Sequence, residues 1–131
     1  MSKTNYLENK VLDHTLGVAS YTQPTAIYVG LFTTEPQEDG TGTEVSGNGY
    51  ARESITFSSA SNGQTNGPAT GDGAVEFTAN GGSWGTITHF ALFDALTAGN
   101  MLYKGALSTS KTVADGDSVR FAETSIIITE D

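Results

Sequence analysis

The sequence predicts a mainly β protein, an antiparallel β-sandwich or jelly-roll-like domain with one short N-terminal α-helix. The 131 residues include 16 Gly, and Ser and Thr fill many polar positions, which is typical of β proteins with many turns. Only one segment has apolar residues at helical spacing. About seven or eight short β-prone segments follow it, separated by turn signals, which favours a sandwich. The length fits a single domain, residues 1–131.

The predicted helix spans residues 5–17. Leu7 and Val11 are four residues apart, as are Leu12 and Leu16, so we interpret these side chains as one apolar stripe. A helix this short is marginal in isolation and is therefore expected to dock on the rest of the domain.

Both ends of this helix carry end signals. Asn5 followed by Glu8 three residues later fits a capping box, with Asn in place of Ser or Thr. Gly17 stands where a C-terminal cap is expected.

The β domain is predicted over residues 25–129, and its first strand, 25–34, follows Pro24. One face of that strand carries Ile27, Val29 and Leu31, and the other carries Ala26, Tyr28 and Phe32. Both faces are apolar, which predicts a strand covered on both sides. The preceding helix is a candidate cover for one of them.

Two long polar loops are predicted, at 35–52 and 61–73. The first is rich in Gly and carboxylates, and loops of this length in a compact domain are often functional. The second contains Asn-Gly pairs, which are turn signals. Residues 53–60 and 74–82 alternate in polarity and are predicted as half-buried strands.

The last third of the chain is predicted to form hairpins. GTITHFALFDA and NMLYKGALS flank the turn LTAGN, and SKTVADGDSVRFA carries an Asp-Gly turn between two short strands. TSIIITED is the last predicted strand. Its apolar positions are even-numbered, whereas Val119 and Phe121 are odd, so we expect a turn or bulge within 122–124.

Ser83 lies in a G-x-S-x-G pattern, which marks the nucleophile elbow of α/β-hydrolases. An elbow needs a helix after the Ser, whereas a β-rich run follows here. His89 comes before Asp94, against the hydrolase order, and lies ~20 Å along the same extended segment. We therefore predict no catalytic residue and no enzyme.

The segment around the single Trp is predicted to serve packing or a subunit interface. The candidate residues are Trp84, His89, Phe90, Phe93, Leu7 and Val11. Trp84 looks exposed in the sequence, and we expect it either to pack or to lie at an interface. His89 is in phase with Ile87, Ala91 and Phe93, the setting of a hydrogen-bonded core or interface His. With one other His and no Cys, the sequence offers no zinc ligand set.

The first loop is a candidate binding loop. Its candidate residues are Glu35, Glu38, Asp39, Glu44 and Tyr50. Paired carboxylates also occur in glycosidases, but a Gly-rich loop offers no desolvated site that would raise the pKa of a general acid. Calcium remains an alternative, because Ca²⁺ takes several oxygen ligands, although no spacing matches an EF-hand. Tyr50 is available for stacking on a sugar, which predicts a host-surface or glycan-binding module as the alternative function.

Charge and hydropathy exclude other classes. The chain has 15 Asp and Glu against six Lys and Arg, a formal charge of −9 that would repel a nucleic-acid backbone. No apolar run approaches the ~20 residues that a membrane helix needs, and the N-terminus has no secretion signal. We predict no nucleic-acid, membrane, metal or cofactor partner.

Several segments together resemble a family of small tailed-bacteriophage virion proteins, often labelled tail fibre proteins. They are NYLENKVLDHTLG, YVGLFTTEP, GTGTEVSGNGYAR, ITF, WGTITHFALFDA and GALSTSKTVADGDSVRFA, in that order, from about Asn5 to about Thr129. The resemblance implies a non-enzymatic structural role in a virion assembled in the bacterial host cytoplasm, and it supplies no catalytic residues.

The sequence contains neither repeats nor a shaft, so we expect a compact subunit rather than an extended fibre. Apolar strands and low charge favour a subunit that buries surface against its neighbours. The predicted function is an oligomeric accessory subunit on the particle surface, either capsid decoration (a cement protein) or a tail or head fibre module. The expected partners are copies of itself, as a trimer, and other virion proteins of the capsid shell or tail.

Overall fold

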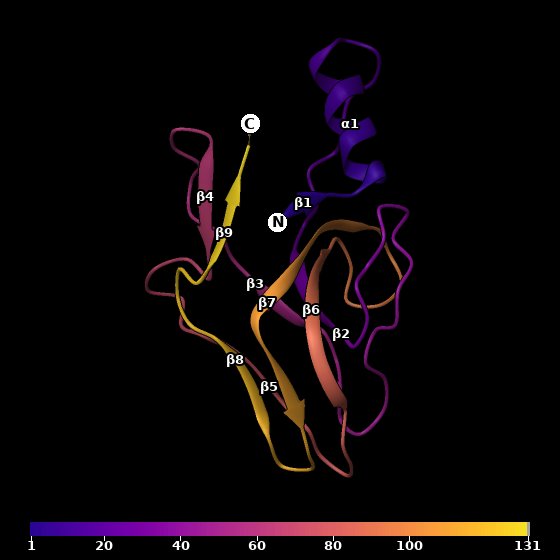
Figure 1. Cartoon of the computed structure of the whole chain (residues 1–131). Helices are drawn as coiled ribbons and strands as arrows, with labels where there is room; N and C mark the ends of the chain where they lie inside the picture. The colour runs from indigo at the N-terminus through magenta and orange to yellow at the C-terminus, as the bar shows by residue number, and fades with distance from the viewer. Residues whose placement is uncertain (131) are drawn as a thin grey trace.

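The computed structural model describes residues 1–130 and confirms a mainly β fold with one helix near the N-terminus. The elements follow in the order β1 (Ser2–Lys3), α1 (Asn5–Thr15), β2 (Ile27–Phe32), β3 (Glu53–Ile55), β4 (Gln64–Gly67), β5 (Val75–Thr78), β6 (Gly85–Phe93), β7 (Met101–Val113), β8 (Ser118–Phe121) and β9 (Ile126–Thr129), as Figure 1 shows.

The strands form one larger sheet and two ribbons. The sheet has the order β1-β7-β6-β2-β3, and every pairing in it is antiparallel. The ribbons β4-β9 and β5-β8 are also antiparallel and lie beside the sheet (Figure 1). The β6–β7 hairpin, joined by the predicted turn, is the longest pairing and forms the centre of the molecule.

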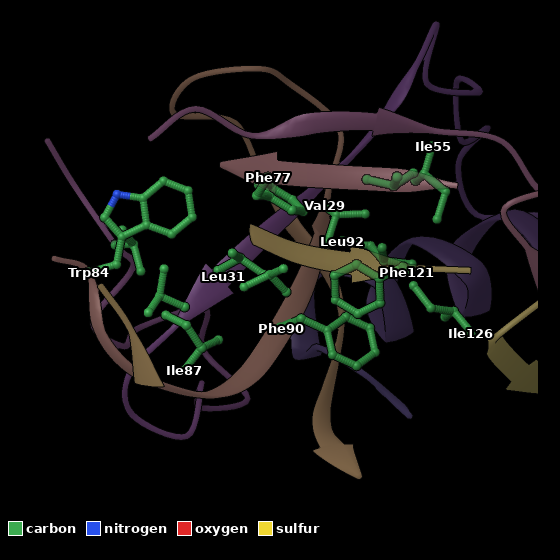
Figure 2. Packing of buried hydrophobic residues seen from close by; sticks show 14 of the residues in the cluster. Val29, Leu31, Ile55, Phe77, Trp84, Ile87, Phe90, Leu92, Phe121 and Ile126 are labelled. Carbon is green, nitrogen blue, oxygen red and sulfur yellow. The ribbon is translucent and has the colours of Figure 1, made fainter. Parts of the chain in front are cut away.

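The main core lies between the sheet and the β5-β8 ribbon. Figure 2 shows Val29 and Leu31 of β2 and Phe90 of β6 packed with Phe77 and Phe121 of the ribbon. The predicted alternation of β5 is confirmed, because its apolar positions are buried and its polar ones exposed. Removing these side chains from water supplies the main stabilisation of the sandwich.

The second apolar face of β2 is covered by the loop, not by the helix. Phe32 and Phe93 form a smaller cluster with Ala91 and Met101, and the rings of Phe32 and Phe93 stack at 6.1 Å. Loop 35–52 lies over this face, where Gly42 approaches Phe32 so closely that an added Cβ would lie 3.1 Å from the ring. The prediction that the helix covers β2 is wrong, since α1 packs on β1 and β7.

The start of α1 differs from the predicted capping box. The N-cap is Thr4, whose hydroxyl accepts a hydrogen bond from the Leu7 amide and donates to the carbonyl of Met101 at 2.6 Å. Thr4 can cap because its backbone is extended at the end of β1, whereas Asn5 is already the first helical residue. The predicted end is confirmed to within a turn, with Gly17 at φ +80° after the C-cap Leu16.

The apolar residues of α1 form two stripes rather than one. Leu7 is buried and Val11 half-buried, but Leu12 and Leu16 are 55% and 72% exposed. At 3.6 residues per turn, the second pair lies about 140° around the helix from the first. Only the stripe of Leu7 and Val11 docks on the domain.

The second predicted loop, 61–73, contains a strand. β4 pairs with β9 along its full length, so the prediction of a loop there is wrong for Gln64–Gly67. The strand was missed because its residues are polar and do not alternate with apolar ones. The expected turn before the last strand is confirmed at 123–124, where Thr124 takes φ +62°.

A large bulge in β7 changes which face of the sheet the residues of β6 occupy. Ile87 pairs with Lys111, but His89 pairs with Ala106, so the four residues 107–110 of β7 have only Thr88 opposite them. Ile87 therefore points into the main core. The prediction that Ile87 shares a face with the residues of the smaller cluster is wrong for this reason.

Two segments that were predicted as separate strands form the single strand β7. Residues 110–113 belong to β7 itself, so the separate strand predicted before the Asp-Gly turn is a continuation of the hairpin. Within residues 1–130, no helix is both long and apolar enough to cross a membrane.

Candidate functional site

Ser83 is held in a structural role. Its hydroxyl donates a 2.8 Å hydrogen bond to the carbonyl of Val113 and accepts one from the amide of Gly85. It thereby fixes the turn into β6. His89 lies farther along the strand, where its Nδ1 faces the Thr88 hydroxyl at 2.8 Å. Within residues 1–130, no hydrogen bond joins Ser83 and His89.

Trp84, predicted to pack or to lie at an interface, is buried within the chain. The side chain is 7% exposed, and its indole N–H donates to the carbonyl of Asn48 at 3.0 Å. Asn48 in turn donates from its amide to the carbonyl of Ser83. Two hydrogen bonds and the indole ring thus attach loop 35–52 to the start of β6, and Trp84 serves packing within the chain.

The predicted interface aromatics of β6 are also packed inside the chain. Phe90 lies 5.4 Å from Phe121 in the main core, and Phe93 stacks on Phe32 in the smaller cluster. Of the six residues predicted for packing or an interface, His89 and Val11 are partly exposed.

The carboxylates of loop 35–52 are spread over separate contacts. Glu35 lies 3.7 Å from Nε2 of His89, and Glu38 makes a 3.1 Å ion pair with Lys104. Asp39 accepts hydrogen bonds from the amide and the hydroxyl of Thr41, and these bonds lower the pKa of its carboxyl below the usual value. Among residues 1–130, no group of three or more His, Cys, Asp or Glu side chains gathers in a way that could hold a metal ion.

Glu44, Arg52 and Tyr50 form a clamp between loop 35–52 and the sheet. The guanidinium of Arg52 donates to both carboxylate oxygens of Glu44 at 2.9 Å, and the Tyr50 hydroxyl donates to the same carboxylate at 2.6 Å. A bidentate pair of this kind combines strength with fixed geometry. Arg52 is 8% exposed, so solvent weakens the pair little.

Arg52 extends the clamp to the β6–β7 turn. Its Nη1 donates to the carbonyls of Ala95 and Ala98 at 2.9 and 2.8 Å, and its guanidinium lies 3.4 Å from the centroid of the Phe93 ring. One side chain therefore fixes the loop, the turn and the covering of the smaller cluster. The cation–π contact with this buried ring adds to the attraction.

Tyr50 is committed to this clamp. Its ring packs 5.5 Å from Trp84 and 6.2 Å from Phe77, and its hydroxyl accepts a hydrogen bond from the amide of Leu31. Burial, followed by the hydrogen bond to Glu44, raises the pKa of Tyr50 far above its ordinary value. The ring is therefore used for packing inside the chain, whereas the carboxylates of Glu35 and Glu38 in the same loop are exposed.

The sequence held one overlooked signal for the clamp. Gly30 interrupts an apolar strand, and a Cβ at that position would lie 2.8 Å from Glu44 Oε2 and 2.9 Å from the Phe93 ring. A Gly inside a strand often marks the close approach of another group. Arg52 carried no such signal, because the turn carbonyls that it binds lie 43 and 46 residues away in the sequence.

A groove lies between the β7 bulge and the strands β8 and β9, and we call it the β7–β8 groove. It has a volume of about 650 Å³. Apolar side chains line much of it, among them Met1, Leu107, Val119 and Ile127. Ile127 is 52% exposed. Sequence reasoning missed the groove because the bulge that opens it is not visible as a pattern.

The cations of the groove are Lys111 and Arg120. Lys111 donates to the carbonyl of Ser118, and Arg120 lies across the ribbon from Glu76 without forming an ion pair. Among the described residues neither cation is paired with a carboxylate, although the chain as a whole carries a formal charge of −9.

The geometry thus shows packed aromatics, a structural clamp and an open groove, and comparison with known families agrees with such a building block. Residues 2–129 match the family described as "Podophage GP4 fiber I protein gp80". The chain belongs to this podophage fiber I family. The comparison with curated proteins found no match.

Membership in the podophage fiber I family confirms the resemblance to phage tail fibre-type proteins, and it supports a structural role in a phage virion. The match covers both long loops and the whole β domain. A fibre family also indicates a virion-associated protein.

Proposed function

We propose that this chain is a non-enzymatic, oligomeric accessory subunit on the surface of a phage particle, acting as a fibre module or as capsid decoration. The observation that carries the proposal is the family match over residues 2–129. The contacts of Ser83 and Tyr50 support it, since these two candidate side chains are used to hold the fold.

The proposed partners are copies of the chain and other virion proteins of the capsid shell or tail. A trimer is the proposed copy number, as one of the closed cyclic arrangements that identical subunits form. Assembly on the particle would take place in the bacterial host cytoplasm.

The proposal is tested on purified particles. Mass spectrometry should detect the chain in a fixed ratio to the major capsid protein, and a density map should place it outside the shell or on the tail. Particles made without the gene should lack that density. Finding the chain only in the host lysate and never in banded particles would contradict the proposal.

A further inference from the structure

α1 carries an apolar stripe that nothing in the chain covers. Leu12 and Leu16 lie on it, and Val18 follows just after the helix; the three are 55%, 72% and 74% exposed. Together they are the largest group of exposed apolar side chains near one another in sequence. Side chains spaced four residues apart on a helix form the pattern with which helices enter apolar grooves.

Carboxylates border this stripe on both sides. At about 100° per residue, Glu8 and Asp13 lie on either side of Leu12 and Leu16, whereas Lys10 lies on the other half of the helix. Neither Glu8 nor Asp13 forms an ion pair within residues 1–130. The free face of α1 is therefore apolar at its centre and acidic at its edges.

The β7–β8 groove has the complementary character. Of the six Lys and Arg, three form ion pairs with carboxylates and Lys10 lies over the ring of Tyr6. The remaining two, Lys111 and Arg120, both line the groove. The β7–β8 groove thus carries the two remaining cations of an acidic chain.

The helix of one chain does not fill the groove of the same chain. α1 packs on β1 and the start of β7, and Figure 1 shows it extending away from the sheet beyond that end. Its free stripe is solvent-exposed in this position. The two surfaces can meet only between two copies.

We propose that the free stripe of α1, with Leu12, Leu16 and Val18, docks in the β7–β8 groove of a second copy, with Glu8 and Asp13 facing Lys111 and Arg120. The contact joins two different surfaces, so it is head-to-tail, and each subunit uses its helix once and its groove once. Such contacts close into a ring or continue as a filament. This inference rests on the oligomeric part of the proposed function and names the surfaces that produce it.

The first test removes the stripe. In the full chain, the double variant Leu12→Ser, Leu16→Ser should convert the oligomer into single chains of 13.7 kDa in light scattering after size exclusion. Both side chains are exposed, so the melting temperature should stay close to that of the unchanged protein. The matched control is Leu96→Ser, which removes a half-exposed Leu from the β6–β7 turn and should leave the oligomer intact.

The second test exchanges charges. Arg120→Glu should weaken association at least tenfold, and Asp13→Lys in the same chain should restore much of it by re-forming the opposite pair. Lys10→Glu, on the other half of α1, is the control and should have little effect. Loss of association in Arg120→Glu without any rescue by Asp13→Lys would overturn the proposed pairing.

The third test depends on the head-to-tail geometry. A chain with the altered stripe keeps its groove, and a chain with Arg120→Glu keeps its helix, so mixing the two should give a dimer that grows no further. A dimer formed by identical surfaces would give no such complementation. Failure of the mixture to associate would overturn the inference.

The outcomes separate this inference from the proposed function. An oligomer that survives the change of Leu12 and Leu16 refutes the helix-in-groove contact and leaves an oligomeric subunit in place. An unchanged protein that stays a single chain at all accessible concentrations refutes self-association itself. Groove variants that self-associate normally but are lost from particles would assign the groove to another virion protein and would also overturn the inference.

Discussion

At the scale of single residues, Arg52 joins more parts of the molecule than any other side chain described above. It binds Glu44 with two hydrogen bonds, two carbonyls of the β6–β7 turn, and the face of Phe93. A guanidinium suits this position because its donors are fixed in a plane, whereas a Lys ammonium could satisfy only part of the set.

Replacing Arg52 should therefore be costly. Arg52→Met leaves the Glu44 carboxylate and two carbonyls without donors, and we expect the free energy of unfolding to fall by about 3 kcal/mol in urea denaturation. Lys10→Met, at an exposed position on α1, is the matched control and should change it by less than about 0.5 kcal/mol. An equally small effect of Arg52→Met would show that the clamp is dispensable.

Tyr50 makes the free energy of unfolding fall as the pH rises into the alkaline range. The pKa of its hydroxyl is raised in the folded state, so the neutral form is favoured there and the contribution is fully present below the unfolded pKa of about 10. Above that pH the unfolded chain releases the proton first, and stability falls. Tyr50→Phe should flatten the fall by up to about 1.4 kcal/mol per pH unit, measured by denaturation between neutral and strongly alkaline pH. Equal slopes for both proteins would contradict this role.

At the scale of elements, the attachment of loop 35–52 to β6 explains how so long a loop stays ordered. Trp84 and Asn48 hold its second half, and the clamp holds its centre. Loop 35–52, which the sequence predicted to be available for binding, is thus packed against the sandwich and covers the smaller cluster.

Trp84→Ala should cost about 3–5 kcal/mol, because it empties a buried site next to Tyr50 and removes the bond to Asn48. Trp84→Phe keeps most of the packing and should cost less, which separates the ring from the hydrogen bond. Thermal unfolding monitored by near-ultraviolet circular dichroism provides the measurement. A near-neutral Trp84→Ala would indicate that the indole contributes little to packing.

Thr4 is the residue on which the start of α1 depends. Thr4→Ala removes the cap of the Leu7 amide and the bond to Met101, so we expect a loss of about 1–2 kcal/mol and fraying of the first turn. Amide exchange in residues 5–8 should speed up. Thr4→Ser keeps the hydroxyl and serves as the control, and equal exchange in both variants would argue against the cap.

The sequence predicted those elements whose local pattern agrees with their surroundings. β5 alternates because one face is buried, and the β6–β7 hairpin has a clear turn. β4 was not predicted because its own residues are polar. The apolar side chains of this ribbon belong to its partner β9. Ile87 was placed on the wrong face because alternation continues only where pairing is regular, and the bulge breaks it.

The candidate site was less predictable than the fold. Glu44 and Tyr50 were recognised as notable residues, but as ligands of something outside the chain, because a sequence does not show that Arg52 and Leu31 lie beside them. Burial and partners are properties of the folded chain, and they decide whether a polar side chain is available.

At the scale of the whole molecule, residues 1–131 should unfold as one domain. Strands far apart in sequence pair in both ribbons, and the main core draws side chains from β2, β5, β6, β8 and β9. We expect calorimetric and van't Hoff enthalpies to agree for a chain kept monomeric by the stripe variant. Two separable transitions would show that the β4-β9 ribbon melts independently.

The grip of Arg52 on the β6–β7 turn bears on how the protein survives digestion by proteases. The carbonyls that it binds belong to Ala95 and Ala98, which stand on either side of the exposed Leu96 and Thr97. After cleavage between those two residues, both new chain ends would still be bound to the Arg52 guanidinium. The pairing between β6 and β7 would remain intact. The cleaved protein should therefore migrate as a single species under native conditions. It should separate into two fragments only under denaturing conditions, such as in detergent.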